Sequence, residues 1–132
     1  MYRLLFAFII VPLVFISIRP ADAGGAPAAK WLRQHFQEYP VGGGWYVPSV
    51  WQASDGSVSI TVLVPDAQAK AMMGNGKEST RRALAVICPG PKSPVWDILG
   101  QPESGFDKPL SIWVSGRERE SGHHFLSVQC AR

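Results

Sequence analysis

The sequence predicts a small exported α+β domain that is held together by one disulfide. Three observations support this: an N-terminal apolar segment before a small-residue cleavage pattern, two stretches in which apolar and polar residues alternate, and several short helical patterns. We expect two antiparallel β-hairpins and three to four short helices. With 132 residues and no internal repeat or linker, the chain is predicted to form a cleavable signal peptide, residues 1–23, and one exported domain, residues 24–132.

The first 23 residues have the three parts of a secretory signal. Arg3 precedes the apolar run Leu4–Ile18, and Ala21-Asp22-Ala23 then provides the small residues that a signal peptidase requires before Gly24. A membrane-spanning helix needs about 20 apolar residues, so this run is short for a permanent anchor. We therefore predict cleavage between Ala23 and Gly24, with membrane attachment only if the signal stays uncleaved.

Cys88 and Cys130 are the only cysteines. An exported protein meets an oxidising compartment, so we expect these two residues to form a disulfide. In the chain-entropy model a loop of this length contributes on the order of 4 kcal/mol. A redox role is not favoured, because the chain lacks the C-x-x-C spacing that lowers a thiol pKa.

An amphipathic helix is predicted over Ala28–Tyr39, with Pro27 at its first position and Pro40 ending it. Its apolar face carries residues at spacings of three and four. They are Trp31, Leu32, His35, Phe36 and Tyr39.

A hairpin is predicted from Trp45–Ala53 and Ser57–Val64, with Asp55-Gly56 as a two-residue turn. That turn would place Trp51 opposite Ile60, on the same face as the aliphatic residues of the second arm. Pro48 cannot donate a ladder hydrogen bond, so the first arm should be an edge strand.

The middle of the chain predicts short helices. Asp66 should cap a helix over 67–73, and Ser93-Pro94 should open another that ends at Leu99. The segment 79–88 fits either a helix or a buried strand; its alanines and arginines favour the helix. Residues 101–108 are expected to form a loop.

The second hairpin is predicted from Leu110–Ser115 and His124–Ala131, joined by the mixed-charge loop Gly116–Gly122. In this pattern Trp113 lies on the face opposite the aliphatic residues of its strand.

Charge and motifs argue against several function classes. After removal of the signal peptide, 11 basic and 9 acidic residues remain, and this small surplus does not predict nucleic-acid binding. Gly42-Gly43-Gly44 lacks the following Gly-Lys-Ser/Thr of a phosphate loop, and no cofactor is expected.

A small hydrolase or metal-dependent enzyme that uses His123 or His124 is the alternative from a different class. These two histidines are adjacent, so on a strand they would point to opposite faces. His35, the third histidine, lies on the apolar side of its helix, and the chain has no G-x-S-x-G motif.

The aromatic residues favour a binding role. Tyr46 and Trp113 are predicted on non-core faces, and Arg117 and Arg119 in the loop, so these four form a candidate binding surface. The other interpretation is that most of the aromatic rings form the core.

We therefore expect a non-enzymatic binding or accessory protein of the cell envelope, periplasmic or secreted. Its partner would be another envelope or secreted protein, and the sequence leaves the oligomeric state open. A further alternative is an enzyme inhibitor that acts through the 116–122 loop.

Overall fold

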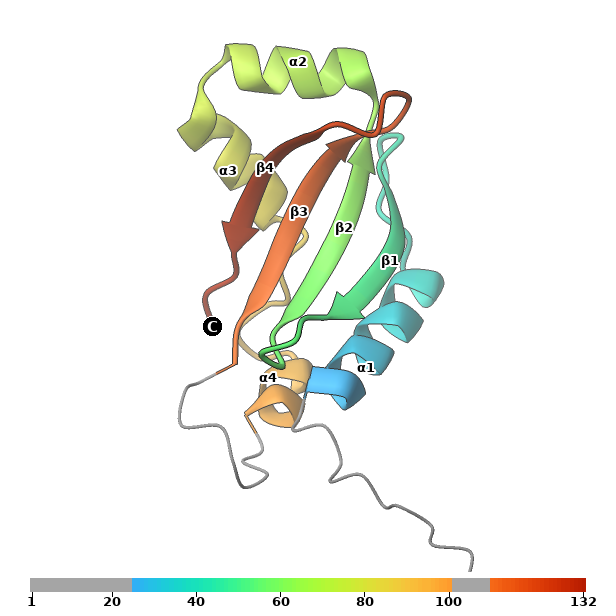
Figure 1. Ribbon diagram of the computed structural model, residues 1–132, viewed down its shortest axis with the longest axis vertical. Helices are drawn as coiled ribbons and strands as arrows, with labels where there is room; N and C mark the ends of the chain where they lie inside the picture. The colour runs from blue at the N-terminus through green and yellow to red at the C-terminus, as the bar shows by residue number, and fades with distance from the viewer. Residues whose placement is uncertain (1–24, 101–109) are drawn as a thin grey trace, which may run out of the picture.

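Four strands form one sheet in the order β1-β2-β3-β4 (Figure 1). The structure is a computed structural model and describes residues 25–100 and 110–132, so the predicted signal peptide, its cleavage site at Ala23 and Gly24, and the predicted loop 101–108 lie outside it. The elements are α1 (Gly25–Glu38), β1 (Tyr46–Gln52), β2 (Val58–Val64), α2 (Asp66–Gly74), α3 (Lys77–Ala85), α4 (Pro94–Leu99), β3 (Ile112–Glu118) and β4 (His124–Gln129). The predicted α+β class, with two hairpins and one disulfide, is confirmed.

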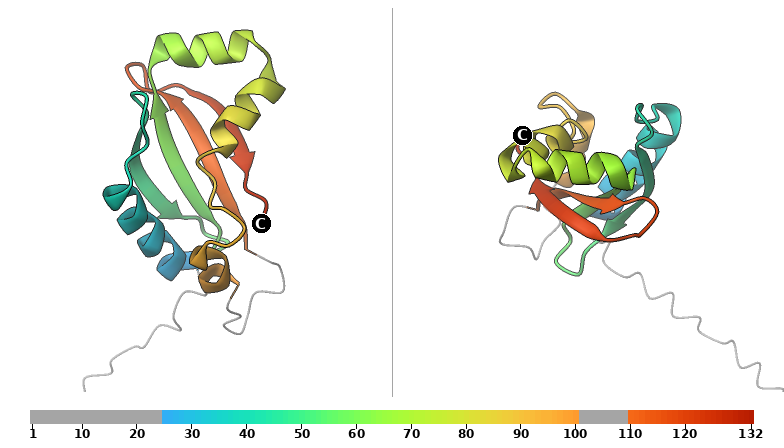
Figure 2. Two further views of the ribbon diagram at one scale, coloured as in Figure 1. Left: turned by 180° about the vertical axis from the view of Figure 1, so that it is seen from behind. Right: turned by 90° about the horizontal axis from the view of Figure 1, so that it is seen from above.

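The helices all lie on one side of the sheet. Figure 1 looks onto the opposite side, where the strands are in full view, and the view from above in Figure 2 shows the helices as a separate layer. Strands β1 and β2 pair antiparallel, β2 and β3 pair parallel, and β3 and β4 pair antiparallel. The parallel central pair requires a crossover, which α2, α3 and α4 provide.

The first hairpin differs from the prediction by one residue in register. Ala53 N–H donates to Ser57 at 2.7 Å and Gly56 N–H donates to Ala53 at 3.0 Å, so the loop has three residues rather than two. Gly56 has φ of +88°, the left-handed conformation that such a loop needs. Trp51 therefore pairs with Ser59 instead of Ile60 and points away from the core, contrary to the prediction.

An irregularity within β1 limits the effect of this shift. The register changes between Tyr46 and Ser49, so the first residues of the hairpin keep the predicted faces. Trp45 and Val47 pack against the core, while Tyr46 is exposed. β1 is an edge strand, as Pro48 predicted.

The second hairpin has a longer first strand than predicted. β3 continues through Glu118, because all seven residues of β2 pair with it, so Gly116 and Arg117 belong to the strand and not to the loop. The chain turns at residues 119–121. β4 contains a bulge at Phe125, which places this ring over Gly116 on the core side.

Helix α1 covers β1 and also packs on α4. It begins at Gly25, before Pro27, and ends at Glu38. Leu32 is buried as predicted, but Tyr39 lies beyond the helix and is 64% exposed, so its assignment to the apolar face was wrong.

The crossover helices follow the predicted pattern with one correction. The segment 79–88 is helical in its first part, within α3, and Ser93 caps α4 by accepting from the Val95 N–H. Asp66 does not cap α2: it is the first helical residue, and its Oδ1 accepts from Glu120 N–H at 2.9 Å. The start of α2 is thereby attached to the turn between β3 and β4.

One apolar cluster lies between the sheet and the helices. Its central members come from the inward positions of β2 and β3, and each is completely buried. They are Val58, Ile60, Val62, Val64, Ile112 and Val114.

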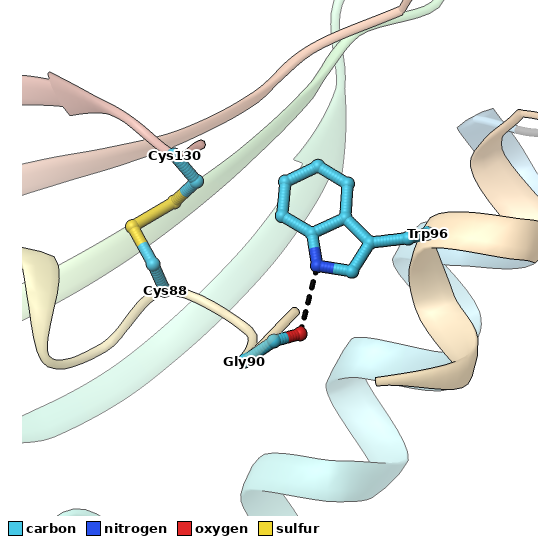
Figure 3. Close-up of a disulfide and its surroundings, with 4 residues drawn as sticks. All are labelled: Cys88, Gly90, Trp96 and Cys130. Atoms are coloured by element: carbon cyan, nitrogen blue, oxygen red, sulfur yellow. Dashed lines mark hydrogen bonds between the residues drawn. A yellow bond between two sulfur atoms is a disulfide. The ribbon is translucent and has the colours of Figure 1, made fainter. Parts of the chain in front are cut away.

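The predicted disulfide between Cys88 and Cys130 is present, with 5.5 Å between the two Cα atoms (Figure 3). It joins the segment after α3 to the residue that follows β4. Beside it, the Trp96 indole N–H donates to the carbonyl oxygen of Gly90 at 2.9 Å, so α4 is attached to the same segment.

Removal of the disulfide should weaken the fold strongly. The bond closes a loop with a sequence separation of 42, for which the chain-entropy model gives about 4 kcal/mol. We expect the double variant Cys88→Ala, Cys130→Ala to lose about this amount in urea unfolding monitored by tryptophan fluorescence. The reduced wild-type protein is the control and should match the variant; equal stability of the oxidised and reduced proteins would contradict the prediction.

Gly116 should not tolerate a side chain. A Cβ atom there would lie 2.7 Å from Cζ of Phe125 and 3.1 Å from Cδ1 of the fully buried Leu84. We expect Gly116→Ala to cost about 1 to 3 kcal/mol of unfolding free energy, as overpacking does. Gly42→Ala is the matched control, since nothing lies within 4 Å of its Cβ position; similar midpoints for both variants would refute the close packing.

Candidate binding site on the open face of the sheet

The side of the sheet without helices carries three rows of side chains, each row running across the strands. Residues paired in register point to the same side of a sheet. The first row is Trp51, Ser59, Trp113 and Gln129; the second is Ser49, Thr61, Ser115 and Ser127; the third is Tyr46, Leu63, Arg117 and His124. The first two rows contain no charged residue.

A shallow groove of about 260 Å³ lies on this face between the two tryptophans. Trp51 and Trp113 form its sides and are 49% and 39% exposed. Side chains with hydroxyl groups also line the groove. Ser59 lies between the two tryptophans in register, Ser115 and Ser127 belong to the second row, and Ser57 lies with Asp55 at the β1–β2 loop.

The indole of Trp113 is fixed by a chain of hydrogen bonds. Its Nε1–H donates to Ser111 Oγ at 3.0 Å, and Ser111 Oγ lies 3.1 Å from Ser57 Oγ. Ser57 Oγ donates to Oδ2 of Asp55 at 3.3 Å, and Oδ1 of Asp55 accepts from the Ser57 N–H at 2.9 Å. An exposed ring held in this way is already ordered before a ligand arrives, which lowers the entropic cost of binding.

The four residues of the predicted binding surface are only partly brought together. Trp113 and Arg117 share the open face, in the first and third rows, and Tyr46 pairs with Leu63 at the end of the third row. Arg119 lies beyond the strand, where its N–H donates to the Val64 carbonyl. The guanidinium of Arg117 donates to the Gly122 carbonyl at 3.0 Å, toward the turn.

The two histidines of the enzyme alternative, His123 and His124, contact different groups. Nε2 of His124 lies 2.7 Å from Ser127 Oγ on the open face, while Nδ1 of the exposed His123 lies 3.9 Å from the Glu118 carboxylate. His35 stacks on Trp31 in α1, with ring centroids 5.0 Å apart. Within residues 25–100 and 110–132 no group of three potential metal ligands occurs.

Asp66 at the start of α2 and Glu120 in the β3–β4 turn contact each other through hydrogen bonds. The Asp66 N–H donates to Glu120 Oε2 at 2.9 Å, in return for the bond from Glu120 N–H. The side-chain hydrogen bond with Glu120, and then the backbone N–H groups of Glu120 and Ser121, lower the pKa of Asp66. The contact connects the β3–β4 turn to α2 and does not reach the groove.

The sequence pattern missed Trp51 and the polar residues of the groove as site residues. A two-residue turn at Asp55-Gly56 predicts that Trp51 faces the core. The alternative three-residue loop with glycine last would have moved it to the open face. Ser59 and Thr61 were correctly predicted to point away from the core, but on their own they resemble ordinary solvent-facing residues.

The fold has a counterpart among solved structures. The chain superimposes on the crystal structure of "a putative secreted protein" from Pseudomonas aeruginosa with a TM-score of 0.51 and 13% identity, covering 80% of this chain and 90% of the other. At this identity the likeness shows a shared fold. The sequence matches no protein-family model and no curated protein.

The disulfide indicates an oxidising compartment, as expected for an exported protein. A helix with the length and apolar character needed to cross a bilayer does not occur in the described part of the chain.

Loss of the Ser111 hydroxyl should release the Trp113 ring. In Ser111→Ala the indole N–H loses its acceptor, and we expect faster ring motion and stronger acrylamide quenching. Indole 15N relaxation, compared with Trp96, would measure the motion. Trp96 serves as the internal control because its own bond to Gly90 is unaffected; unchanged relaxation of Trp113 would show that the hydrogen-bond chain does not order it.

Proposed function

We propose that this protein is a small, non-enzymatic binding protein of the cell envelope, exported to the periplasm or beyond, that binds its ligand on the open face of the sheet. The observation that carries the proposal is the groove between two exposed tryptophans, one of which is fixed by a chain of hydrogen bonds. The disulfide and the predicted signal peptide support the location.

Burial and exposure in this protein favour a binding role for these two rings. The inward positions of the sheet are filled by aliphatic residues, so the core does not need Trp51 or Trp113. Exposed tryptophans are unfavourable for solubility, and they are enriched where proteins bind partners. The two exposed tryptophans of the open face therefore favour a role in ligand binding over a role in the core.

The side chains of the groove support binding rather than chemistry. Serine hydroxyls line the groove, and the carboxylate of Asp55 at its end accepts hydrogen bonds from Ser57. His124 contacts Ser127 at 2.7 Å, but no carboxylate contact that would orient this imidazole is present in the described residues.

Replacement of either tryptophan should abolish retention of the envelope ligand. We would immobilise the exported protein and compare what it, Trp51→Ala and Trp113→Ala retain from an envelope fraction of the source cells. The component retained by the wild type should be lost from both variants. Because interface tryptophans are frequent binding hot spots, we expect at least about a tenfold loss in affinity.

Tyr39→Ala is the matched control. It also removes a large exposed aromatic side chain, 64% exposed, but from the segment that follows α1 and outside the residues that line the groove. Circular dichroism and the urea midpoint would establish that all variants are folded. Retention of the same component by both tryptophan variants would overturn the assignment of the open face.

A further inference from the structure

We infer, on the basis of the proposed function, that the ligand is an uncharged glycan chain that crosses the strands of the open face and stacks sugar rings on Trp51 and Trp113. Three features of the open face support this ligand class: two exposed indoles, the hydroxyl-bearing side chains beside them, and the two strand intervals between the residues that carry the indoles.

The aromatic sides match the apolar face of a sugar. A pyranose ring presents a flat patch of C–H groups, which packs favourably on the electron-rich face of an indole. Both indoles stand on the open face, and Trp113 is held by Ser111 in a defined orientation. Each ring thus offers a flat surface to one sugar residue.

The hydroxyl groups that line the groove match the hydroxyl groups around the edge of a sugar ring. Hydroxyl groups both donate and accept hydrogen bonds, as sugar hydroxyls do. The hydroxyl-bearing residues that line the groove are Ser57, Ser59, Ser115 and Ser127. The first two rows carry no charge, and the Asp55 carboxylate at the end of the groove accepts hydrogen bonds from Ser57, so this surface favours a neutral ligand over an anionic one.

The spacing of the strands that carry the two tryptophans matches an extended chain. Trp51 and Trp113 lie on either side of β2, two strand intervals apart, which is about 10 Å between backbones. In a β-1,4-linked glycan consecutive sugars are turned over, so alternate residues present the same face. Two indoles that lie two sugar units apart would therefore stack on the same face of the first and third sugars. The middle sugar would lie above Ser59.

A peptide fits this face less well. Peptides bind sheets mainly by adding a strand at an edge, where backbone N–H and C=O groups are free. In the middle of this sheet those groups of β2 and β3 are paired with neighbouring strands. A peptide that crossed the strands would have only side-chain hydroxyls as partners for its backbone.

Binding of soluble oligosaccharides tests the inference. We would titrate the exported protein with β-1,4-linked N-acetylglucosamine oligomers from the monomer to the hexamer, and follow the indole NMR signals of all five tryptophans. We expect both Trp51 and Trp113 signals to shift. The affinity should rise steeply between the disaccharide and the trisaccharide, because only the trisaccharide reaches both rings, and it should change little with salt.

Matched variants separate the glycan from other ligands. Trp51→Ala and Trp113→Ala should each weaken trisaccharide binding about tenfold or more, and Tyr39→Ala should not. An affinity that falls steeply with salt would point to the third-row Arg117 and overturn the neutral-ligand inference.

Failure of this inference differs from failure of the proposed function. If no oligomer binds while both tryptophan variants still lose the envelope component, the open face is a binding site and the ligand is not this kind of glycan. If that component proves to be a protein or peptide, the glycan inference is likewise overturned. If neither oligomer nor envelope component depends on the tryptophans, both proposals fail.

Discussion

The register between β1 and β2 is the constraint on which the open face depends. It is set by a three-residue loop that closes with Gly56 at φ of +88°. Side chains alternate along a strand, so a shift by one residue moves every side chain after it to the opposite face. With this loop Trp51 stands beside Ser59 and across from Trp113; with a two-residue turn it would lie among the aliphatic residues of the core.

The parallel pairing of β2 with β3 completes the same face. It brings together two hairpins that are separated by some fifty residues of sequence, and it places a tryptophan on each side of β2. A parallel pair needs a long crossover connection, which α2, α3 and α4 supply. The disulfide fixes the end of the second hairpin to this crossover, beside the contact between Trp96 and Gly90.

Much of the fold was predictable, because the inward residues of β2, β3 and the helices follow clear periods. Val58, Ile60, Val62 and Val64 alternate with polar residues, and the two cysteines allow only one pairing. The candidate site was only half predictable. The face of Trp113 could be predicted because apolar and polar residues alternate along its strand. The face of Trp51 depends on whether Gly56 closes a two-residue turn or a three-residue loop, and the sequence is compatible with both.

The hydrogen-bond chain could not be predicted, for a different reason. Ser57 and Ser111 are separated by 54 residues, and they meet only because β2 and β3 are paired side by side. No local pattern distinguishes such serines from ordinary turn residues. Long-range pairing creates the part of the site that fixes Trp113.

Features of the edge strand β1 disfavour a ligand that would pair with it as an added strand. An edge strand exposes backbone groups that can recruit another strand. Here Nε of Arg33 on α1 donates to the Val50 carbonyl at 2.8 Å, and Pro48 removes one donor from β1. With its backbone partly satisfied in this way, β1 is a poor template for strand addition. The ordered aromatic rings and hydroxyl groups, which lie on the open face, remain the groups best placed to recognise a ligand.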